Sequence, residues 1–328
     1  MRGYALKMRT APLTVAVLDD YQEVARLYGP WESLGDAAEV TVFHDHIVND
    51  GVLRDLLCEY EAIVAMRERT PFTAKRLASL SNLRLLVTTG MGNASIDMDA
   101  AREQGVTVCG TRGLPSPTAE LAWGLIIALT RHIVEEDQRL RDGGWQLTIG
   151  PELAWRTLGL IGLGNLGARM ARIAAAFEMD VIAWSENLTS EAAAEAGARA
   201  VTKHELLEQA DVVSIHTRLS DRTRGLIGAR ELELMKPSAV LVNTSRGPIV
   251  DEDALLAAVH EGTIAGAALD VYDVEPLPKD HPLREAPRTL LTPHLGYVSD
   301  GTYDVFYRDV VEDIAAWLRC EPLRVLNG

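Results

Sequence analysis

A glycine-rich turn between an apolar run and a helical pattern constrains the fold more than any other feature. The run Thr157–Ile161 leads into Gly162–Gly167, with the sequence GLGNLG, and helical spacing follows. In such a G-x-G-x-x-G turn the first glycine makes the tight bend, Gly164 admits a pyrophosphate and Gly167 lets helix and strand pack closely. Because the next strand, Val181–Trp184, is in register, the segment predicts a dinucleotide-binding βαβ unit. The alternative is a glycine-rich turn without a ligand.

Short runs rich in Val and Ile alternate with helical patterns along most of the chain. Such runs are Leu13–Leu18, Val40–Phe43, Ala62–Ala65 and Leu85–Thr88. Segments between them, such as 23–27 and 53–59, have apolar residues at helical spacing. This alternation predicts an α/β fold of parallel sheets covered by helices. The chain has 328 residues, enough for two hydrophobic cores.

The segment Gly113–Pro117 is the predicted domain boundary, because its two prolines and its glycine disfavour helix. A long helix is expected from about Thr118 to Arg141, capped by Ser116 or Thr118. Another helix, predicted over 301–319, is expected to return to the first domain.

The predicted organisation is therefore a discontinuous domain, residues 1–117 plus 298–328, and a second domain, residues 118–297. Residues 1 to about 11 precede the first predicted strand and are interpreted as a leader.

The charge balance argues against two classes of partner. The chain has 47 acidic and 32 basic residues, a formal net charge of -15. Lys and Arg bind phosphate backbones and anionic lipids, so this balance disfavours nucleic acid and membrane surfaces. The longest apolar run near the middle, Leu125–Leu129, is too short to span a bilayer.

The cysteines are few and show no paired spacing: Cys58, Cys109 and Cys320. This odd, sparse set argues against a disulfide framework and for a reduced, cytoplasmic setting. His44 and His46 alternate at the end of a predicted strand and are interpreted as surface residues. We expect no metal site.

Arg246, Glu275 and His294 each follow an apolar run in three successive segments, 241–251, 268–276 and 290–297. The carboxyl ends of parallel strands share one edge of a sheet, where such sheets bind ligands. Taken singly, these residues could be a surface ion pair, a solvated loop acid and a cap or core histidine. Their joint appearance at successive strand ends favours a common site.

These three residue types suit the reduction of a 2-oxo acid, which takes a hydride at the carbonyl carbon and a proton at its oxygen. Histidine titrates near neutrality and can supply that proton. A carboxylate beside it favours the imidazolium form and fixes the ring. Arginine offers a planar fork of donors to the substrate carboxylate.

On these motifs the chain resembles the D-isomer-specific 2-hydroxyacid dehydrogenases, a family that includes phosphoglycerate, glyoxylate/hydroxypyruvate and formate dehydrogenases. The most specific matches are 162–167, 243–253, 268–278 and 292–296. The resemblance implies two Rossmann-like or flavodoxin-like parallel-sheet domains with a cleft between them, and a homodimer. It implies that Arg246 binds substrate, that Glu275 pairs with the histidine and that His294 is the acid/base.

The resemblance also implies contacts to an NAD cofactor, with NADP as the alternative, and to the substrate. The implied cofactor contacts are Thr118, Gly162, Gly164, Asn165, Leu166, Gly167, Ser185, His216, Thr217, Thr244, Ser245, Asp270 and Gly296. Asp270 would face the nicotinamide amide. The implied substrate contacts, besides Arg246, are Met91 and Gly92 in a glycine-rich turn, and Arg67 after an apolar run is a further candidate.

The chain departs from the family pattern at several positions. Ser185 stands where an aspartate usually binds the adenine ribose, and Glu186 beside it mildly favours NAD. Arg218 replaces a common proline, and Tyr297 replaces a small residue. Two other functions stay open: an NAD(H)-sensing binding protein similar to corepressors of this fold, and a formate- or phosphite-oxidising enzyme.

Overall fold

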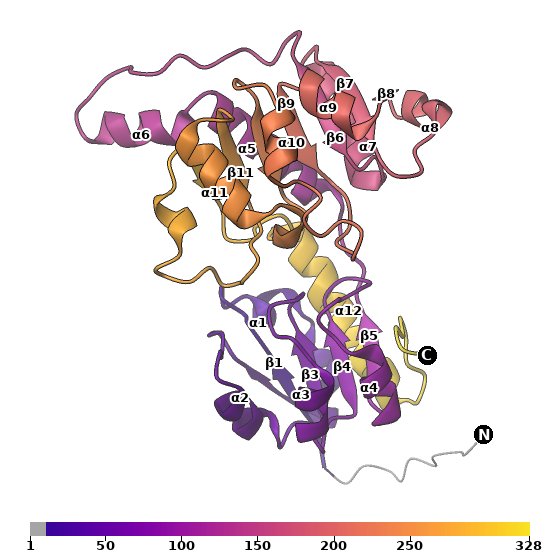
Figure 1. The fold of residues 1–328 in the computed structure, drawn as a ribbon. Helices are drawn as coiled ribbons and strands as arrows, with labels where there is room; N and C mark the ends of the chain where they lie inside the picture. Colours follow the sequence, from indigo (N-terminus) through magenta and orange to yellow (C-terminus); the bar gives the residue numbers. More distant parts are fainter. Residues whose placement is uncertain (1–10) are drawn as a thin grey trace. The chain divides into compact units, whose positions relative to one another are not determined.

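Residues 11–328 are described by a computed structural model, in which the chain forms two compact units. One unit runs to Leu114 and takes in Ser299–Gly328, and the other is Pro115–Val298. In the colours of Figure 1, the yellow C-terminal helix lies with the indigo and purple strands of the first unit. The interpretation of residues 1 to about 11 as a leader falls almost entirely outside the described residues. No helix in the described range has the length and apolar character needed to cross a bilayer.

The first unit is built on a five-stranded parallel sheet with the order β2-β1-β3-β4-β5. Its strands are β1 (Leu13–Val17), β2 (Ala38–Val42), β3 (Ala62–Ala65), β4 (Leu85–Thr88) and β5 (Thr107–Gly110). Its helices are α1 (Ala25–Tyr28), η1 (Trp31–Ala37), α2 (Asp50–Leu57), α3 (Ala74–Ser79), α4 (Met98–Glu103) and α12 (Asp300–Leu318). Strands β3 and β4 are buried along their whole length, as expected for parallel strands covered on both faces.

The second unit contains a seven-stranded parallel sheet with the order β12-β11-β10-β9-β6-β7-β8. Its strands are β6 (Thr157–Ile161), β7 (Asp180–Trp184), β8 (Arg199–Ala200), β9 (Val212–Ile215), β10 (Val240–Asn243), β11 (Gly266–Leu269) and β12 (Thr289–Leu291). The chain moves outward from β6 through β7 and returns to β9 on the other side of β6. This order confirms the α/β fold and creates a switch point at the carboxyl ends of β6 and β9.

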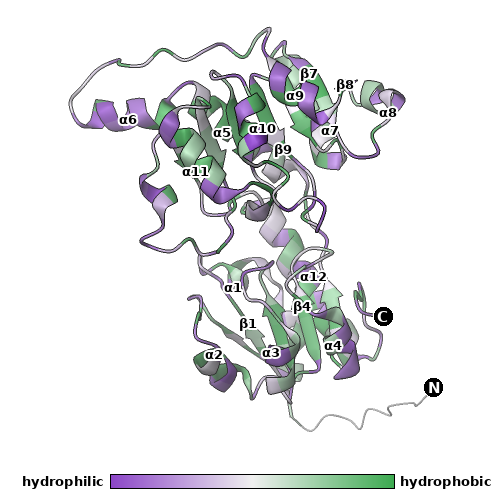
Figure 2. Cartoon of the chain, in the orientation of Figure 1, coloured by the Kyte–Doolittle hydropathy of each residue, from purple (hydrophilic) through white to green (hydrophobic). Residues whose placement is uncertain are grey.

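Helices and 3₁₀ turns connect these strands. They are α5 (Ser116–Thr130), α6 (Ile133–Arg141), α7 (Asn165–Ala176), α8 (Ser190–Glu195), α9 (Lys203–Gln209), α10 (Ala229–Leu234), η2 (Gly247–Ile249), α11 (Glu252–Glu261) and η3 (Pro282–Glu285). Two apolar clusters cover the two faces of this sheet. Figure 2 shows the hydrophobic strands inside and the polar outer surfaces of the helices.

The single helix predicted from Thr118 to Arg141 is wrong, because the structure has α5 and α6 in its place. His132 between them takes a left-handed conformation, with φ of 53°, which interrupts the helical hydrogen bonds. The predicted caps are also wrong: Pro115 precedes the helix without a side-chain bond, and Ser116 lies in its first turn. The Thr118 hydroxyl instead donates to the Gly296 carbonyl oxygen at 2.8 Å.

The C-terminal segment of the first unit adds backbone bonds along β5. Gly110 N donates to the Arg324 carbonyl oxygen, and Leu326 N donates to that of Val108. The Asn327 side chain accepts from Val108 N at 2.9 Å and donates to the Val106 carbonyl oxygen at 2.8 Å. A tail without regular structure thereby covers the sheet edge.

Candidate active site

The predicted site residues of the second unit lie at the carboxyl ends of neighbouring strands. His294 follows β12, Glu275 follows β11 and Arg246 follows β10. His216 follows β9 and the turn at Gly162 follows β6, so both adjoin the switch point. Residues far apart in the sequence therefore share one edge of one sheet.

The glycine turn has the geometry that a dinucleotide requires. A Cβ at Gly162 would lie 2.7 Å from the carbonyl group of His216, and one at Gly167 would overlap the Gly162 carbonyl oxygen. A Cβ at Gly164 would meet no atom within 4 Å, so the space beside this residue is open. Helix α7 begins at Asn165 and directs its free N–H groups to that side. The turn is closed where packing requires it and open where a pyrophosphate would bind.

Two buried polar atoms add to this fit. Within residues 11–328, neither His216 Nδ1 nor Thr244 Oγ1 has a hydrogen-bond partner. Burial lowers the pKa of His216 to about 4, so the ring is neutral at physiological pH, and its Nε2 lies 2.8 Å from Ser214 Oγ. Buried polar atoms without partners are costly, and both belong to residues predicted to contact the cofactor. The residues present therefore fit a bound dinucleotide.

Ser185 lies at the end of β7 and contacts the glycine turn. Its hydroxyl accepts a hydrogen bond from Leu163 N at 3.1 Å. The following Glu186 and Asn187 are exposed. The serine hydroxyl still has its own proton, so it can accept a hydrogen bond from the turn and donate one to a ribose at the same time.

His294 and Glu275 form a close pair. The Nδ1 atom of His294 lies 2.6 Å from Glu275 Oε2, and both side chains are largely buried. The other carboxylate oxygen, Oε1, accepts from Tyr272 N at 2.9 Å. The carboxylate is thus held at both ends, and the imidazole keeps Nε2 for another partner. His294 itself has a left-handed backbone, with φ of 54°.

The turn that carries Arg246 is shaped by Asn243. The Asn243 amide donates to the Arg246 carbonyl oxygen at 2.9 Å and accepts from Ser245 N at 3.0 Å. Ser245 Oγ donates to the Ile215 carbonyl oxygen at 2.9 Å, so this predicted cofactor contact ties the turn to β9.

Asp270, another predicted cofactor contact, is fully buried at the end of β11. Its Oδ1 accepts from the Thr292 hydroxyl at 2.6 Å and from Leu295 N at 2.7 Å, and its Oδ2 accepts from Gly296 N at 2.8 Å. Burial raises the pKa of Asp270 by more than these bonds lower it.

The three predicted substrate contacts of the first unit lie after β3 and β4. Arg67 has a left-handed backbone, with φ of 51°, and its guanidinium donates to the Thr89 carbonyl oxygen at 3.1 Å. Met91 is exposed, and a Cβ at Gly92 would meet no atom within 4 Å. All three lie at the carboxyl edge of their own sheet.

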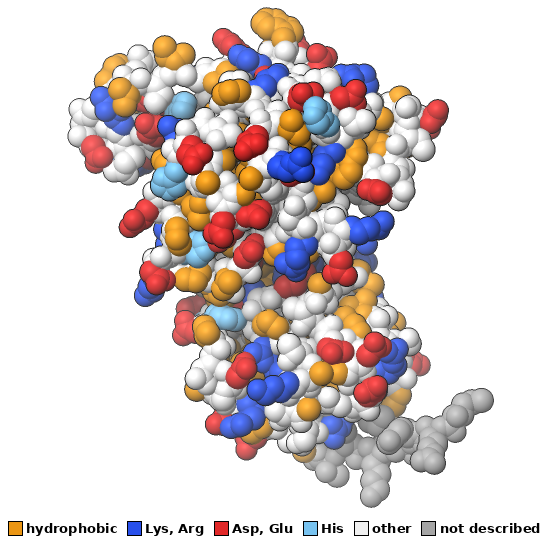
Figure 3. All heavy atoms as spheres, in the orientation of Figure 1, with side chains coloured by type: hydrophobic (Ala, Val, Ile, Leu, Met, Phe, Trp, Pro, Cys, Tyr) orange, Lys and Arg blue, Asp and Glu red, His pale blue; other side chains and the backbone are white. Residues whose placement is uncertain are grey.

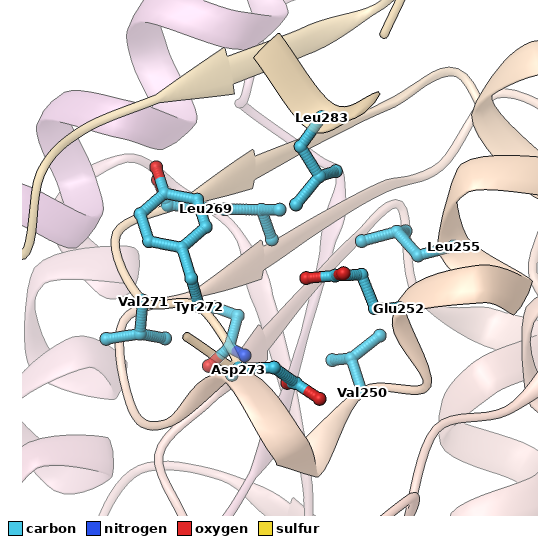
Figure 4. Close-up of a pocket in the computed structure, with 10 residues that line it drawn as sticks. Val250, Glu252, Leu255, Leu269, Val271, Tyr272, Asp273 and Leu283 are labelled. Atoms are coloured by element: carbon cyan, nitrogen blue, oxygen red, sulfur yellow. The ribbon is translucent and has the colours of Figure 1, made fainter. Parts of the chain in front are cut away.

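The cavity beside β10 and β11, shown in Figure 4, does not suit a substrate. Its volume is about 10 Å³, room for roughly one water molecule. The Tyr272 ring points away from the carboxylates of Glu252 and Asp273 at this cavity (Figure 4). In the part of the chain that the structure describes, no three His, Cys, Asp or Glu side chains are placed to hold a metal ion.

Sequence reasoning missed three residues that support the site: Asn243, Tyr272 and Thr292. Asn243 bonds to Arg246, Tyr272 to Glu275 and Thr292 to Asp270, in each case between different segments or within a turn. Motif spacing alone gives no signal for such bonds, although all three lie within the segments singled out as strand ends.

Comparison with known proteins points to a single family. The model of the D-isomer specific 2-hydroxyacid dehydrogenase NAD-binding domain matches residues 123–296. A glyoxylate reductase of Aeropyrum pernix is 42% identical over 66% of this chain and 68% of that protein. A D-3-phosphoglycerate dehydrogenase of Synechocystis is 35% identical over 84% of this chain. This chain spans only about half (50%) of the length of that protein. A solved structure of a phosphoglycerate oxidoreductase from Vibrio cholerae aligns with a TM-score of 0.90 and 38% identity. The alignment covers 94% of this chain and 99% of that chain.

Proposed function

The chain belongs to the D-isomer-specific 2-hydroxyacid dehydrogenase family, and we propose that His294, Glu275 and Arg246 carry out its reaction. It is an NAD-dependent oxidoreductase, and the proposed substrate is a small D-2-hydroxy acid or the matching 2-oxo acid. The observation that carries this assignment is the 2.6 Å pair between His294 and Glu275 at the edge that also bears the glycine turn.

The proton is assigned to His294 Nε2, because Nδ1 is occupied by Glu275. A nicotinamide dinucleotide held at the glycine turn would supply the hydride that a 2-oxo acid takes at its carbonyl carbon. His294 gives its Nε2 proton to the carbonyl oxygen as the hydroxyl forms, and takes it back in oxidation. The Glu275 carboxylate stabilises the imidazolium and fixes the ring.

Arg246 is assigned to the substrate carboxylate and carbonyl oxygen, because a guanidinium offers paired donors to adjacent oxygens. The first unit would contribute Arg67 and the backbone of Met91 and Gly92. We propose residues 1–117 plus 298–328 as the substrate domain and 118–297 as the cofactor domain. Since Cys58, Cys109 and Cys320 are free thiols, we place the protein in the cytoplasm.

The test is a two-cofactor substrate panel. NADH or NADPH is mixed with glyoxylate, hydroxypyruvate, pyruvate and bulkier 2-oxo acids, and the loss of absorbance at ~340 nm is followed. Reduction of one or more of these acids to the 2-hydroxy acid is expected, with the D configuration wherever the product is chiral. Tight NADH binding with no turnover of any acid would instead indicate an NAD(H)-sensing binding protein. Oxidation of formate or phosphite would indicate a formate- or phosphite-oxidising enzyme.

Replacing Ser185 with aspartate is expected to change cofactor choice. A carboxylate there can still accept the Leu163 N–H but repels a ribose 2′-phosphate. A repulsion of about 1.4 kcal/mol, within the range for partly exposed charges, would lower the NADPH/NADH ratio of kcat/KM about tenfold. The matched control is Ser185→Asn, which adds no charge and should leave the ratio nearly unchanged. If the aspartate variant keeps the wild-type ratio, Ser185 does not face the ribose.

We further propose a homodimer formed through α6 and the loop after it. Helix α6 has no buried residue, and this stretch exposes many large apolar side chains. They are Ile133, Val134, Leu140, Trp145, Leu147, Ile149 and Trp155. In Figure 3 hydrophobic side chains lie at the surface around this end of the second unit. Such a concentration marks an association surface.

Replacing Ile149 with aspartate is expected to convert a dimer into a monomer. The Ile149 side chain is 97% exposed, so the change removes no packing within the chain and buries a charge in the interface. Light scattering after size exclusion measures the mass. Leu27→Asp is the matched control, because Leu27 is 77% exposed in the first unit. A wild-type monomer at micromolar concentration, or an Ile149→Asp dimer, contradicts the proposed interface.

A further inference from the structure

The segment Asp270–Glu275, which we name the bracket, contacts both neighbouring loops of the proposed active site. On one side lies the loop Thr292–Gly296, which carries His294. On the other side a Cβ at Gly247, next to Arg246, would overlap the backbone carbonyl group of Tyr272. The bracket is therefore packed directly against the turn that carries Arg246.

The bracket is joined to the His294 loop by bonds from three of its side chains. Asp270 accepts three bonds, from the Thr292 hydroxyl and from the backbone of Leu295 and Gly296. The Tyr272 hydroxyl lies 2.9 Å from the Thr292 carbonyl oxygen, to which it donates. Glu275 binds the imidazole itself. Backbone groups on both sides of His294, and its ring, are thus fixed to one short segment.

The His294 loop needs such support. A left-handed backbone is uncommon for a residue other than glycine, and it persists where surrounding contacts hold it. Asp270 and Tyr272 supply these contacts from buried positions that water does not compete for.

We propose that Asp270 and Tyr272 are positioning residues, which fix the His294 loop to the bracket and so set the place of the imidazole relative to the Arg246 turn. This inference rests on the proposed function. It assigns Asp270 a second role besides facing the cofactor. The His294 loop uses three of the roughly four acceptor positions of the Asp270 carboxylate. The remaining position, on Oδ2, is left for an amide donor.

Three isosteric changes test the role of the bonds without removing packing. Tyr272→Phe deletes only the hydroxyl, and loss of one buried bond is expected to lower kcat about three- to tenfold. Thr292→Val deletes the donor to Asp270 and is expected to act similarly, whereas Thr292→Ser keeps a hydroxyl and should restore the rate. Asp270→Asn, which sets an amide against N–H donors, is expected to lower kcat on the order of 10²-fold. Tyr60→Phe, in the first unit, is the matched control.

A second readout needs no substrate. The proton in the short His294–Glu275 bond should give a separate downfield N–H signal in the NMR spectrum, assigned by its loss in Glu275→Gln. This signal is expected to broaden or shift in Tyr272→Phe, Thr292→Val and Asp270→Asn, and to return in Thr292→Ser. The dissociation constant for NADH, measured by titration, should change less than threefold in Tyr272→Phe and Thr292→Val.

The outcomes separate the inference from the proposed function. An unchanged signal and an unchanged kcat in Tyr272→Phe and Thr292→Val would overturn the positioning role. A loss of NADH binding in Asp270→Asn that equals its loss of rate, with Thr292→Val silent, would also overturn it. If the NMR signal responds as expected but the protein reduces none of the acids, the positioning role is supported and the proposed function is rejected.

Discussion

Replacing His294 with asparagine is expected to abolish most 2-oxo acid reduction while leaving the cofactor site intact. Removing a general acid lowers kcat by about 10²–10⁴-fold. Asparagine is chosen because it tolerates the left-handed backbone that His294 adopts, so the loop keeps its course. The rate is measured at saturating NADH, and the dissociation constant for NADH should stay within about threefold of wild type, since tenfold would already be 1.4 kcal/mol.

The control for this variant is His260→Asn. His260 lies in the last turn of α11 in the same unit and is exposed, so its replacement should leave the rate unchanged. Wild-type kcat in His294→Asn would remove the acid/base assignment. Loss of NADH binding together with rate would show that the loop, and not the proton, had been disturbed.

The parts of the fold that sequence predicted best are those set by local chemistry. The strand before Gly162 and the helix after it lie where the glycine spacing indicates, because each glycine satisfies a separate steric demand. The strand ends at Arg246 and His294 were predictable for a related reason: apolar runs bounded by polar residues mark the limits of buried parallel strands.

Features that depend on long-range contacts could not be predicted. The break at His132 carries no proline or glycine signal, so an uninterrupted helix was the natural expectation. Thr118 has the character of a cap, but its hydroxyl bonds to Gly296, which is remote in sequence. Asn327 continues a sheet edge through its side chain, a role that no periodic pattern reveals. In each case a partner distant along the chain decides the local structure.

The candidate site shows the same contrast between residues that local sequence features predict and residues whose role depends on long-range contacts. Residue type and position at a strand end were enough to select His294, Glu275 and Arg246 as the proposed catalytic residues, since the chemistry limits which side chains can serve. Tyr272 bonds to Glu275 and Asn243 bonds to the turn of Arg246, while Thr292 bonds to Asp270 and so supports the His294 loop indirectly; none of these three has a role of its own in the proposed reaction. Such supporting residues are visible only when the chain is folded.

The largest expected effect on stability is that of replacing Arg324 with alanine. Its guanidinium lies 2.7 Å from Glu312 and 3.0 Å from Asp313, and it donates to the Asp309 carbonyl oxygen at 2.9 Å. Asp309 and Asp313 are almost completely buried, so removing the cation leaves buried carboxylates with less compensation. Breaking a buried pair in this way costs about 3–5 kcal/mol.

The free energy of unfolding is measured with urea, and hydrogen exchange of residues 107–110 reports on the first unit locally, because Arg324 also bonds to Gly110 through its backbone. Arg319→Ala is the control. Its pair with Glu321 is 3.9 Å long and exposed, so its loss should cost less than about 1 kcal/mol. Equal effects of the two changes would show that the buried network contributes nothing special.

The Arg324 effect should also depend on pH. Burial raises the pKa of Asp313 to about 7, so the contribution of this group to stability is complete below its unfolded value of 3.8 and is lost as pH rises through 7. Arg324 opposes that loss by pairing with the ionised form. The deficit of Arg324→Ala should therefore be larger at pH 8 than at pH 5.5, where a protonated Asp313 needs no cation. Asp309, whose pKa is lowered mainly by Arg112 despite its burial, stays ionised across this range, so part of the deficit should remain at pH 5.5. A deficit that does not change with pH would show that Arg324 acts through packing alone.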